Sequence, residues 1–183
     1  AKPFTGPAYK KLKLALDHNL AVYSAHIPLD VHPVLGNNAV LAKDLGWGSL
    51  DSGTLEPFFS WTGIELGRRH RGEMDRDALI EKVEAVTGAP AHHCPGGPET
   101  ARDIGLITGG AGAEIFAIAE TGIDTFITGE GPHWSYTAAE ELGINLIYAG
   151  HYATETFGVK ALSEKLGDQF GVDWCFVDHP TGL

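Results

Sequence analysis

Residues 102–150, RDIGLITGGAGAEIFAIAETGIDTFITGEGPHWSYTAAEELGINLIYAG, carry the repeated pattern that decides the fold of this chain. Three short apolar runs, at 103–108, 123–128 and 144–150, alternate with glycine-containing turns and with segments of helical spacing. Short β-rich runs separated by helices are typical of right-handed βαβ units, whose strands are parallel. The pattern predicts an α/β fold with a mixed, mainly parallel sheet flanked by helices.

The segments on either side of this stretch fit the same class of fold. Helices are expected at 7–19, 35–45, 76–88 and 153–167, and strands at 20–26, 63–69, 89–94 and 172–178. A long glycine-rich loop is expected at 46–63, and a charged turn at 70–74. We treat 1–183 as one domain with lobes at 20–100 and 101–183.

Composition and charge exclude several classes of function. The chain has 183 residues, of which 43% are hydrophobic, and its net charge is −11. A surface with this charge repels phosphate backbones, so nucleic acid is a poor candidate partner. The two cysteines, Cys94 and Cys175, have no C-x-x-C spacing, which fits a reducing compartment. No apolar run reaches the roughly 18 residues of a membrane span, so we expect a cytoplasmic protein that has no contact with membranes.

Polar residues and glycines follow the apolar runs at the points where the predicted strands end. Ligands of open α/β sheets bind beyond the carboxyl ends of the strands, so these residues are the candidate site. They are His26, Asp30 and His32 after the first run, Gly109, Gly110 and Gly112 after the second, Glu130 and His133 after the third, and His151 and Glu155 after the fourth.

The segment GHYATE, residues 150–155, has two interpretations. His151 and Glu155 are separated by four residues and share one face of a helix, so they can hold one divalent cation through nitrogen and oxygen. Alternatively, Glu155 interacts with the helix dipole beside a hydrogen-bonded histidine. Asp30 has the same ambiguity, because a carboxylate in AHIPLD can bridge cations or form a turn.

Three further segments have weaker signals. The turn TGGAGAEI places Gly109, Gly110 and Gly112 before a helix, which suits an anion, but close packing explains these glycines equally well. Glu130 and His133 are a candidate acid and base couple, or else a turn with a capping glutamate. The pair His92-His93 lies on a predicted strand, where adjacent side chains point to opposite faces. We expect one of these histidines to be buried and the other solvated.

Taken together and in order, these segments resemble the NIF-three-like family (NGG-one-interacting-factor-three-like), many members of which are named GTP cyclohydrolase 1 type 2. The similarity rests on YSAHIPLDVHPVLGNNAVLAKDLG (23–46), ITGGAGAEIFAIAETGIDTFITGEGPHW (107–134) and GINLIYAGHYATE (143–155). It implies a two-lobed α/β fold, a dinuclear centre of Zn, Fe, Mn or Mg, and a homohexameric ring. The metal ligands of the family correspond to Asp30, His151 and Glu155. Glu130 and His133 then lie beside the metals as catalytic residues, with His26 next to the centre.

The chain departs from the family pattern at its start. Such proteins carry a His-His pair before KPFTGPAYKKL, whereas this chain begins AKPFTGPAYK without an initiating methionine. We therefore expect the N-terminal segment to be missing, and His92-His93 does not replace the pair. The short spacing between Asp30 and Gly109 leaves no room for the inserted domain of some members, which indicates the short, bacterial-type form.

Two functions follow from these observations. The first is a metal-dependent hydrolase in which an activated water attacks a nucleotide-like substrate such as GTP, with the turn Gly109–Gly112 facing a phosphate. The second is a metal-binding, ring-shaped scaffold without enzymatic activity that binds a partner protein or nucleic acid.

Overall fold

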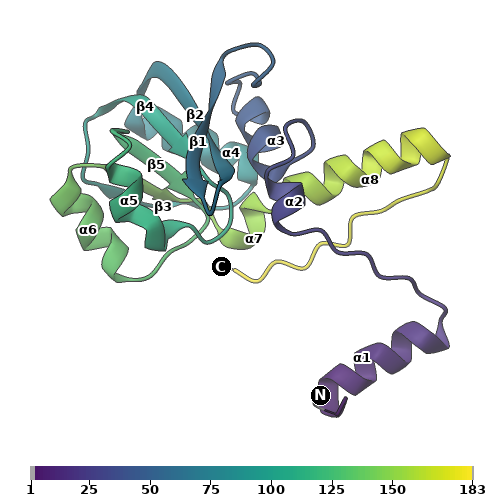
Figure 1. The fold of residues 1–183 in the computed structure, drawn as a ribbon. Helices are drawn as coiled ribbons and strands as arrows, with labels where there is room; N and C mark the ends of the chain where they lie inside the picture. The colour runs from purple at the N-terminus through teal and green to yellow at the C-terminus, as the bar shows by residue number, and fades with distance from the viewer. Residues whose placement is uncertain (1–2, 183) are drawn as a thin grey trace.

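In the computed structural model, which describes residues 3–182, six strands form one sheet in the order β1-β2-β4-β5-β6-β3 (Figure 1). The strands are β1 (Leu55–Trp61), β2 (Ile64–Asp75), β3 (His92–Pro95), β4 (Thr100–Leu106), β5 (Thr125–Thr128) and β6 (Asn145–Tyr148). The helices are α1 (Gly6–Asp17), α2 (Ile27–Asp30), α3 (Asn37–Asp44), α4 (Arg76–Thr87), α5 (Ile115–Ala119), α6 (Trp134–Leu142), α7 (His151–Thr154) and α8 (Thr156–Phe170), with a 3-10 turn η1 at Gly112–Glu114.

The predicted α/β class and mixed sheet are confirmed, and the parallel part of the sheet is its centre. Strands β4, β5 and β6 pair in parallel, as the pattern in 102–150 predicts. The other three pairings are antiparallel, so the sheet as a whole is not mainly parallel. The reason is partly local, because a two-residue connection such as the one between β1 and β2 permits only antiparallel pairing.

Each face of the sheet has its own hydrophobic core. Successive residues of a strand point to opposite faces, so Phe126 packs with α5 and α6, whereas Ile127 packs with α3 and α4. Leu146 and Ile147 divide in the same way on β6. In Figure 1, α4 lies behind the sheet and α5 and α6 lie in front of it. The central strands are therefore covered on both sides, and their carboxyl ends are fixed in position.

The predicted loop 46–63 and the charged turn 70–74 are wrong in part, because both contribute to a long hairpin. Strand β1 begins at Leu55, and β2 continues through the charged residues to Asp75. Thr62 and Gly63 have φ values of 50° and 83°, which is the left-handed backbone that a two-residue hairpin turn requires. Sequence reasoning took this glycine-rich segment for a loop because the turn that closes it has no Asn-Gly or Asp-Gly signal.

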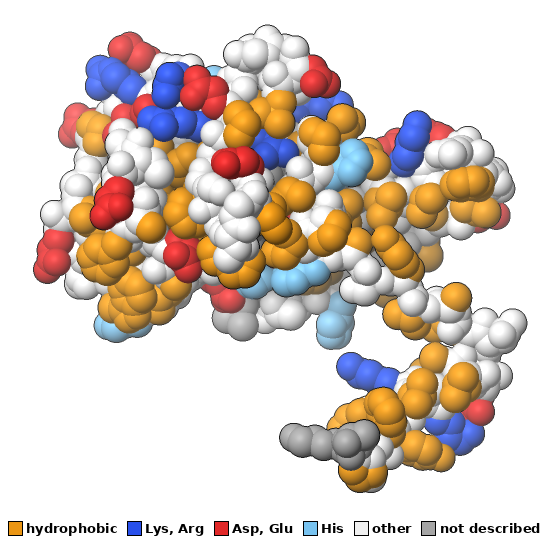
Figure 2. Space-filling view, in the orientation of Figure 1, with side chains coloured by type: hydrophobic (Ala, Val, Ile, Leu, Met, Phe, Trp, Pro, Cys, Tyr) orange, Lys and Arg blue, Asp and Glu red, His pale blue; other side chains and the backbone are white. Residues whose placement is uncertain are grey.

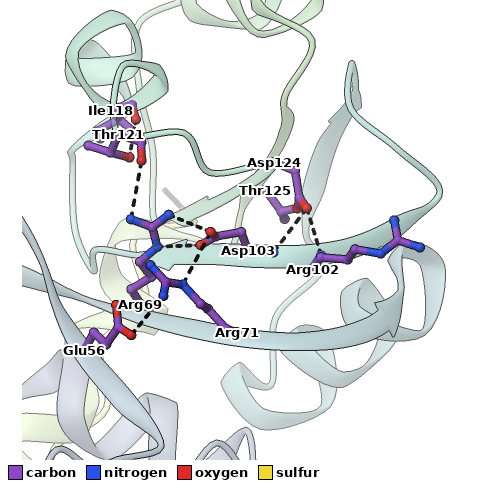
Figure 3. Close-up of polar contacts among 9 residues, drawn as sticks. All are labelled: Glu56, Arg69, Arg71, Arg102, Asp103, Ile118, Thr121, Asp124 and Thr125. Carbon is purple, nitrogen blue, oxygen red and sulfur yellow. Dashed lines mark hydrogen bonds and ion pairs between the residues drawn. The ribbon is translucent and has the colours of Figure 1, made fainter.

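Ion pairs hold this hairpin to the central strands (Figure 3). The Arg69 guanidinium makes two contacts with the Asp103 carboxylate, of 2.5 and 2.6 Å. Arg71 joins Asp103 to Glu56 of β1, at 3.6 and 3.2 Å. Asp124 accepts hydrogen bonds from the backbone N–H groups of residues 102 and 103. Together these contacts connect β1, β2 and β4 with one another and with the residue that precedes β5.

Both terminal segments differ from the prediction. Helix α1 forms as expected, but it has no buried residue and projects away from the sheet (Figure 1). The runs 20–26 and 172–178 are not strands, since neither pairs with a strand in residues 3–182. Most of their apolar side chains are exposed, including Val22 and Val177 at 79% each. Figure 2 shows hydrophobic side chains covering the projecting N-terminal helix.

The remaining helices follow the prediction closely. Asp75 caps α4 by accepting a hydrogen bond from the Ala78 N–H at 2.9 Å, and Gly88 ends that helix with φ 70°. The helix predicted at 153–167 is divided at Glu155 into α7 and α8. The boundary expected between residues 100 and 101 falls at the start of strand β4, within the sheet. None of the helices in residues 3–182 is long and apolar enough to cross a membrane.

Candidate active site

Three loops that follow the parallel strands are tied together by their backbones. The Gly109 carbonyl accepts hydrogen bonds from the N–H groups of Gly129 and Glu130, at 2.8 and 3.0 Å. The Gly150 N–H donates to the Gly129 carbonyl at 3.0 Å. The carboxyl ends of β4, β5 and β6 thus form one continuous rim, as expected for neighbouring parallel strands.

Buried threonines and glycines shape this rim. The Thr154 hydroxyl accepts a hydrogen bond from the Gly109 N–H at 3.0 Å, and the Thr128 hydroxyl donates to the Gly109 carbonyl at 3.1 Å. Gly109 has φ 74°, and a Cβ atom there would overlap Oε1 of Glu155. Only glycine lets the backbone approach this carboxylate so closely.

His151 lies between two carboxylates. Its Nδ1 atom is 2.8 Å from Oε1 of Glu130, and its Nε2 atom is 3.3 Å from Oε2 of Glu155. Glu130 comes from the loop after β5, whereas Glu155 occupies the break between α7 and α8. The imidazole is therefore oriented from both sides by residues that are distant from one another along the chain.

Glu155 is placed where its charge is unfavourable. Burial raises the pKa of Glu155, and the nearby Asp30 carboxylate adds to the rise, while His151 and His26 oppose it. Asp30 and Glu155 line one cavity of about 340 Å³ together with His26, Gly110 and His151. Carboxylates that share a cavity repel each other, and a cation between them would relieve that repulsion.

Two asparagines at the start of α3 position Asp30. The Asn37 amide donates to Oδ1 of Asp30 at 2.6 Å and accepts from the Gly158 N–H at 2.6 Å. Asn38 is 1% exposed and donates to the carbonyls of Asp30 and Leu66. Its side-chain oxygen accepts from the Thr108 N–H at 2.9 Å. Sequence reasoning missed both residues, and the only signal was a pair of amides at the start of a helix next to Asp30.

Residues 1–182 match the family model described as Duf34/NIF3 (NGG1p interacting factor 3). The chain belongs to the Duf34/NIF3 family. The resemblance drawn from the segments at 23–46, 107–134 and 143–155 is therefore confirmed.

Similar Duf34/NIF3 proteins include two named "GTP cyclohydrolase 1 type 2 homolog". The protein from Deinococcus radiodurans is 38% identical over 98% of this chain and 67% of its own length. The protein from Pyrococcus abyssi is 39% identical over 95% of this chain and 68% of its own length. The chain thus spans about two thirds of each relative.

Solved structures share the fold. The protein described as "ybgI, unknown function" superimposes with a TM-score of 0.89 at 33% identity, covering 100% of this chain and 71% of that one. TTHA1606 from Thermus thermophilus gives 0.84 at 33% identity, with the same coverage. Reduced HcgD from Methanocaldococcus jannaschii gives 0.80 at 26% identity, covering 94% and 67%.

The structure brings together most, but not all, of the residues predicted for the Duf34/NIF3 site. Asp30, His151, Glu155 and His26 line one cavity, and Glu130 contacts His151. His133 lies elsewhere, in a cavity of about 470 Å³ that His92 also lines. Glu130 makes its polar contact with His151, and no contact within residues 3–182 joins it to His133. Gly131 and Pro132 lie between them, and His133 stands at the start of α6.

The remaining predicted positions have structural explanations. Gly110 lines the cavity, whereas Gly112 packs against Gly131 and the Tyr148 hydroxyl, which leaves no room for a Cβ atom. His32 accepts hydrogen bonds from the N–H groups of residues 34 and 35 and so stabilises a turn. His92 and His93 are both exposed, contrary to the expectation that one is buried, because β3 lies at the sheet edge.

The donor chemistry of the rim suits a divalent cation, although the ligands are not closed around one. An imidazole and several carboxylates form the mixed nitrogen and oxygen set that Zn, Fe or Mn accepts. Within residues 3–182, no three His, Cys, Asp or Glu side chains are arranged so that they could hold a metal ion. Instead, both His151 nitrogens contact carboxylates, Nδ1 that of Glu130 and Nε2 that of Glu155.

Proposed function

We propose that this Duf34/NIF3 chain is a metal-dependent hydrolase acting on a nucleotide-like substrate, with two divalent ions held by Asp30, His151 and Glu155. The observation that supports the proposal is the arrangement of His151 between two carboxylates, in a cavity that Asp30 also lines. The names of the relatives, "GTP cyclohydrolase 1 type 2 homolog", make GTP the first substrate to examine.

A divalent cation at this rim would supply Lewis acidity, which makes a water molecule acidic enough to yield hydroxide near neutral pH. With Nδ1–H of His151 donating a hydrogen bond to Glu130, Nε2 would be the nitrogen available as a ligand. Because His133 lies in another cavity, we assign proton transfer at this rim to Glu130 alone. The backbone of Gly109 and Gly110 borders the same space and permits close approach of a substrate.

Assembly into a homo-oligomer, such as a hexameric ring, is also part of the proposal. Helix α1 exposes Leu14 and Leu16 at 61% and 72%, and the segment after it exposes Tyr23 at 84%. Exposed apolar side chains in such number on one projecting arm are typical of a protein interface. Light scattering is expected to give a mass that is a multiple of 19.5 kDa; a monomeric mass at all concentrations would contradict the assembly.

The test is GTP turnover by the purified, metal-loaded protein, with and without a chelator. We expect the chelator to abolish turnover, and a His151→Ala, Glu155→Ala double variant to lose roughly 100-fold or more, because metal and ligands act as a unit. A His93→Ala, Glu164→Ala variant is the matched control, since both residues are exposed and outside the cavity. Turnover that survives in the double variant would contradict the proposal. Metal binding without turnover of any nucleotide would favour the non-enzymatic scaffold.

A further inference from the structure

His151 borders a second cavity, of about 420 Å³, in addition to the one that Asp30 lines. His151 and Glu155 line both cavities, whereas Glu130 lines only the second of the two and Asp30 only the first. The rest of the second cavity is formed by α7, α8 and the C-terminal segment, through Tyr152, Thr156, Val159, Phe176 and Thr181. The imidazole can therefore be approached from two sides, and the C-terminal segment borders one of them.

The C-terminal segment, residues 172–182, runs back from the end of α8 toward α7, and we call it the strap (Figure 1). The Tyr152 hydroxyl holds its far end, since it donates a hydrogen bond to Oδ1 of Asp178 and accepts one from the His179 N–H, both at 2.7 Å. Tyr152 directly follows His151 in α7. The short helix that carries the imidazole therefore also fastens the strap.

Two aromatic contacts hold the rest of the strap to α8. The Lys160 ammonium lies 4.3 Å from the centre of the Phe176 ring, which is a cation–π contact. A Cβ atom at Gly167 would stand 2.8 Å from Cδ1 of Trp174, so the indole packs on the helix backbone at this glycine. These contacts place Phe176 in the wall of the second cavity.

The strap is held by few contacts and by little buried surface. Among residues 172–182, Phe176 is partly buried and the others are exposed. Segments with few buried apolar contacts open at a low free energy, and segments that cover a site commonly control access to it. Loss of the hydrogen bonds to Tyr152 is therefore enough to change how often the strap opens.

We propose that the strap is a gate: closed, it forms the outer wall of the second cavity, and its release from Tyr152 admits small molecules to the Glu130 side of His151. Tyr152 is a positioning residue in this gate, because its hydroxyl uses both its donor and its acceptor on the strap. Such a gate is independent of the proposed function, since it controls access to His151 in a hydrolase and in a metal-binding scaffold alike.

The first test is the mobility of a nitroxide spin label on the strap, read by electron paramagnetic resonance. Cys175 is exposed on the strap and Cys94 is buried, so the label reacts with Cys175. We expect Tyr152→Phe to raise the ratio of mobile to immobile label about 10-fold, as expected when two hydrogen bonds are lost, one of them to a carboxylate. Gly167→Ala, whose added methyl group displaces Trp174, should also raise this ratio. Tyr9→Phe, on the projecting helix α1, is the matched control and should leave the spectrum unchanged.

The second test is the rate at which diethyl pyrocarbonate modifies His151 in metal-free protein, followed for each histidine by mass spectrometry. Tyr152→Phe should raise the rate at His151 about 10-fold, in step with the label. The rates at His26, which lines only the first of the two cavities, and at His93, which is exposed on β3, should stay unchanged.

Two results would overturn the gate. One is unchanged label mobility in both Tyr152→Phe and Gly167→Ala. The other is a mobile strap with an unchanged rate at His151, which would show that reagents reach the imidazole through the first cavity instead. Neither test needs metal or turnover, so failure of the gate leaves the hydrolase proposal standing, and loss of the hydrolase proposal leaves the gate testable.

Discussion

At the scale of the residue, Glu155 shows how local structure produces the site. Its backbone, with φ −102° and ψ 7°, ends α7 and precedes α8, so the carboxylate stands at the helix break instead of along a helix face. There it contacts Nε2 of His151 and lies against Gly109. Burial raises its pKa. A carboxylate whose pKa is raised by burial in a cavity is typical of functional sites.

His70 provides a pH dependence of stability that is independent of the site. Its ring stacks on Trp47 with 4.9 Å between centroids, and burial lowers the pKa of His70, with Lys82 adding to the effect. The folded state therefore favours neutral His70, and the unfolded state binds the extra proton between the lowered pKa and about 6.5. Above a pH of about 6.5, His70 should not lower the free energy of unfolding. As the pH falls below about 6.5, His70 should lower the free energy of unfolding progressively.

The measurement is the urea midpoint of wild type and His70→Gln at pH 7.5 and at pH 5.5. The variant should lose less stability on acidification than wild type. His93→Gln, at an exposed position, serves as control and should follow the wild type. An equal loss in wild type and His70→Gln would contradict the assignment.

Asp103 carries the ion pairs that connect β1, β2 and β4 (Figure 3). Its side chain is 23% exposed, and that of Arg69 is 17% exposed, so solvent weakens this pair less than a surface pair. Asp103→Asn should lower the free energy of unfolding by about 1 to 3 kcal/mol, the usual effect of losing hydrogen bonds to a charged partner. In contrast, Asp17→Asn, which breaks an exposed pair with Lys13, should change it by less than about 0.5 kcal/mol. Equal effects in urea unfolding would count against a structural role for Asp103.

At the scale of the element, α3 is the helix that fixes the cavity. Asn38 connects it to the end of α2, to β2 and to the segment after β4 through three hydrogen bonds. The residue is almost completely buried, so removing its amide leaves a buried N–H and two carbonyl groups without partners. Without these bonds, Asp30 loses its fixed position relative to Thr108.

We predict that Asn38→Ala lowers the free energy of unfolding by about 2 to 4 kcal/mol. Urea unfolding followed by tryptophan fluorescence measures this free energy. An unchanged m-value would show that wild type and variant expose the same surface area on unfolding. Gln169→Ala, on the exposed end of α8, is the control. A change below about 1 kcal/mol for Asn38→Ala would show that α3 does not depend on these bonds.

The elements that sequence alone predicts are those that depend on residues within the element itself, such as helix caps and apolar runs. Asp75 and Gly88 mark both ends of α4, and the apolar runs at 103–108, 123–128 and 144–150 become the parallel strands. The segments 20–26 and 172–178 have strand composition but no strand beside them, and pairing depends on distant residues that composition does not reveal. The strand predicted at 63–69 is part of β2, but β1 was missed for the converse reason, since its pairing with β2 overrides a glycine-rich composition.

The candidate site shows the same division between local and distant causes. Placing polar residues at strand ends was enough to predict that Asp30, His151 and Glu155 share one cavity. It did not anticipate that His133, at the start of α6, lines another cavity. It also missed Asn37 and Asn38, whose partners lie as far away as Gly158 and Thr108. The assignment of Asp30, His151 and Glu155 as metal ligands stays a prediction until metal binding is measured.

At the scale of the whole molecule, this Duf34/NIF3 chain is a sheet with cores on both faces, a polar rim at its parallel centre and an apolar arm that nothing in residues 3–182 covers. The sheet gives the rim its rigidity, because β4, β5 and β6 are buried on both sides. The rim places His151 between two carboxylates, in a cavity that Asp30 also lines.

The most direct test of this account is the metal content of the protein after equilibration with Zn, Fe(II) or Mn and dialysis, measured by plasma mass spectrometry. We predict that wild type retains divalent metal, that Glu114→Gln retains the same amount, and that the His151→Ala, Glu155→Ala variant retains at most about a tenth of it, as expected when ligands are removed. Equal metal content in wild type and the double variant, or none in either, would contradict the claim that this rim is a metal centre.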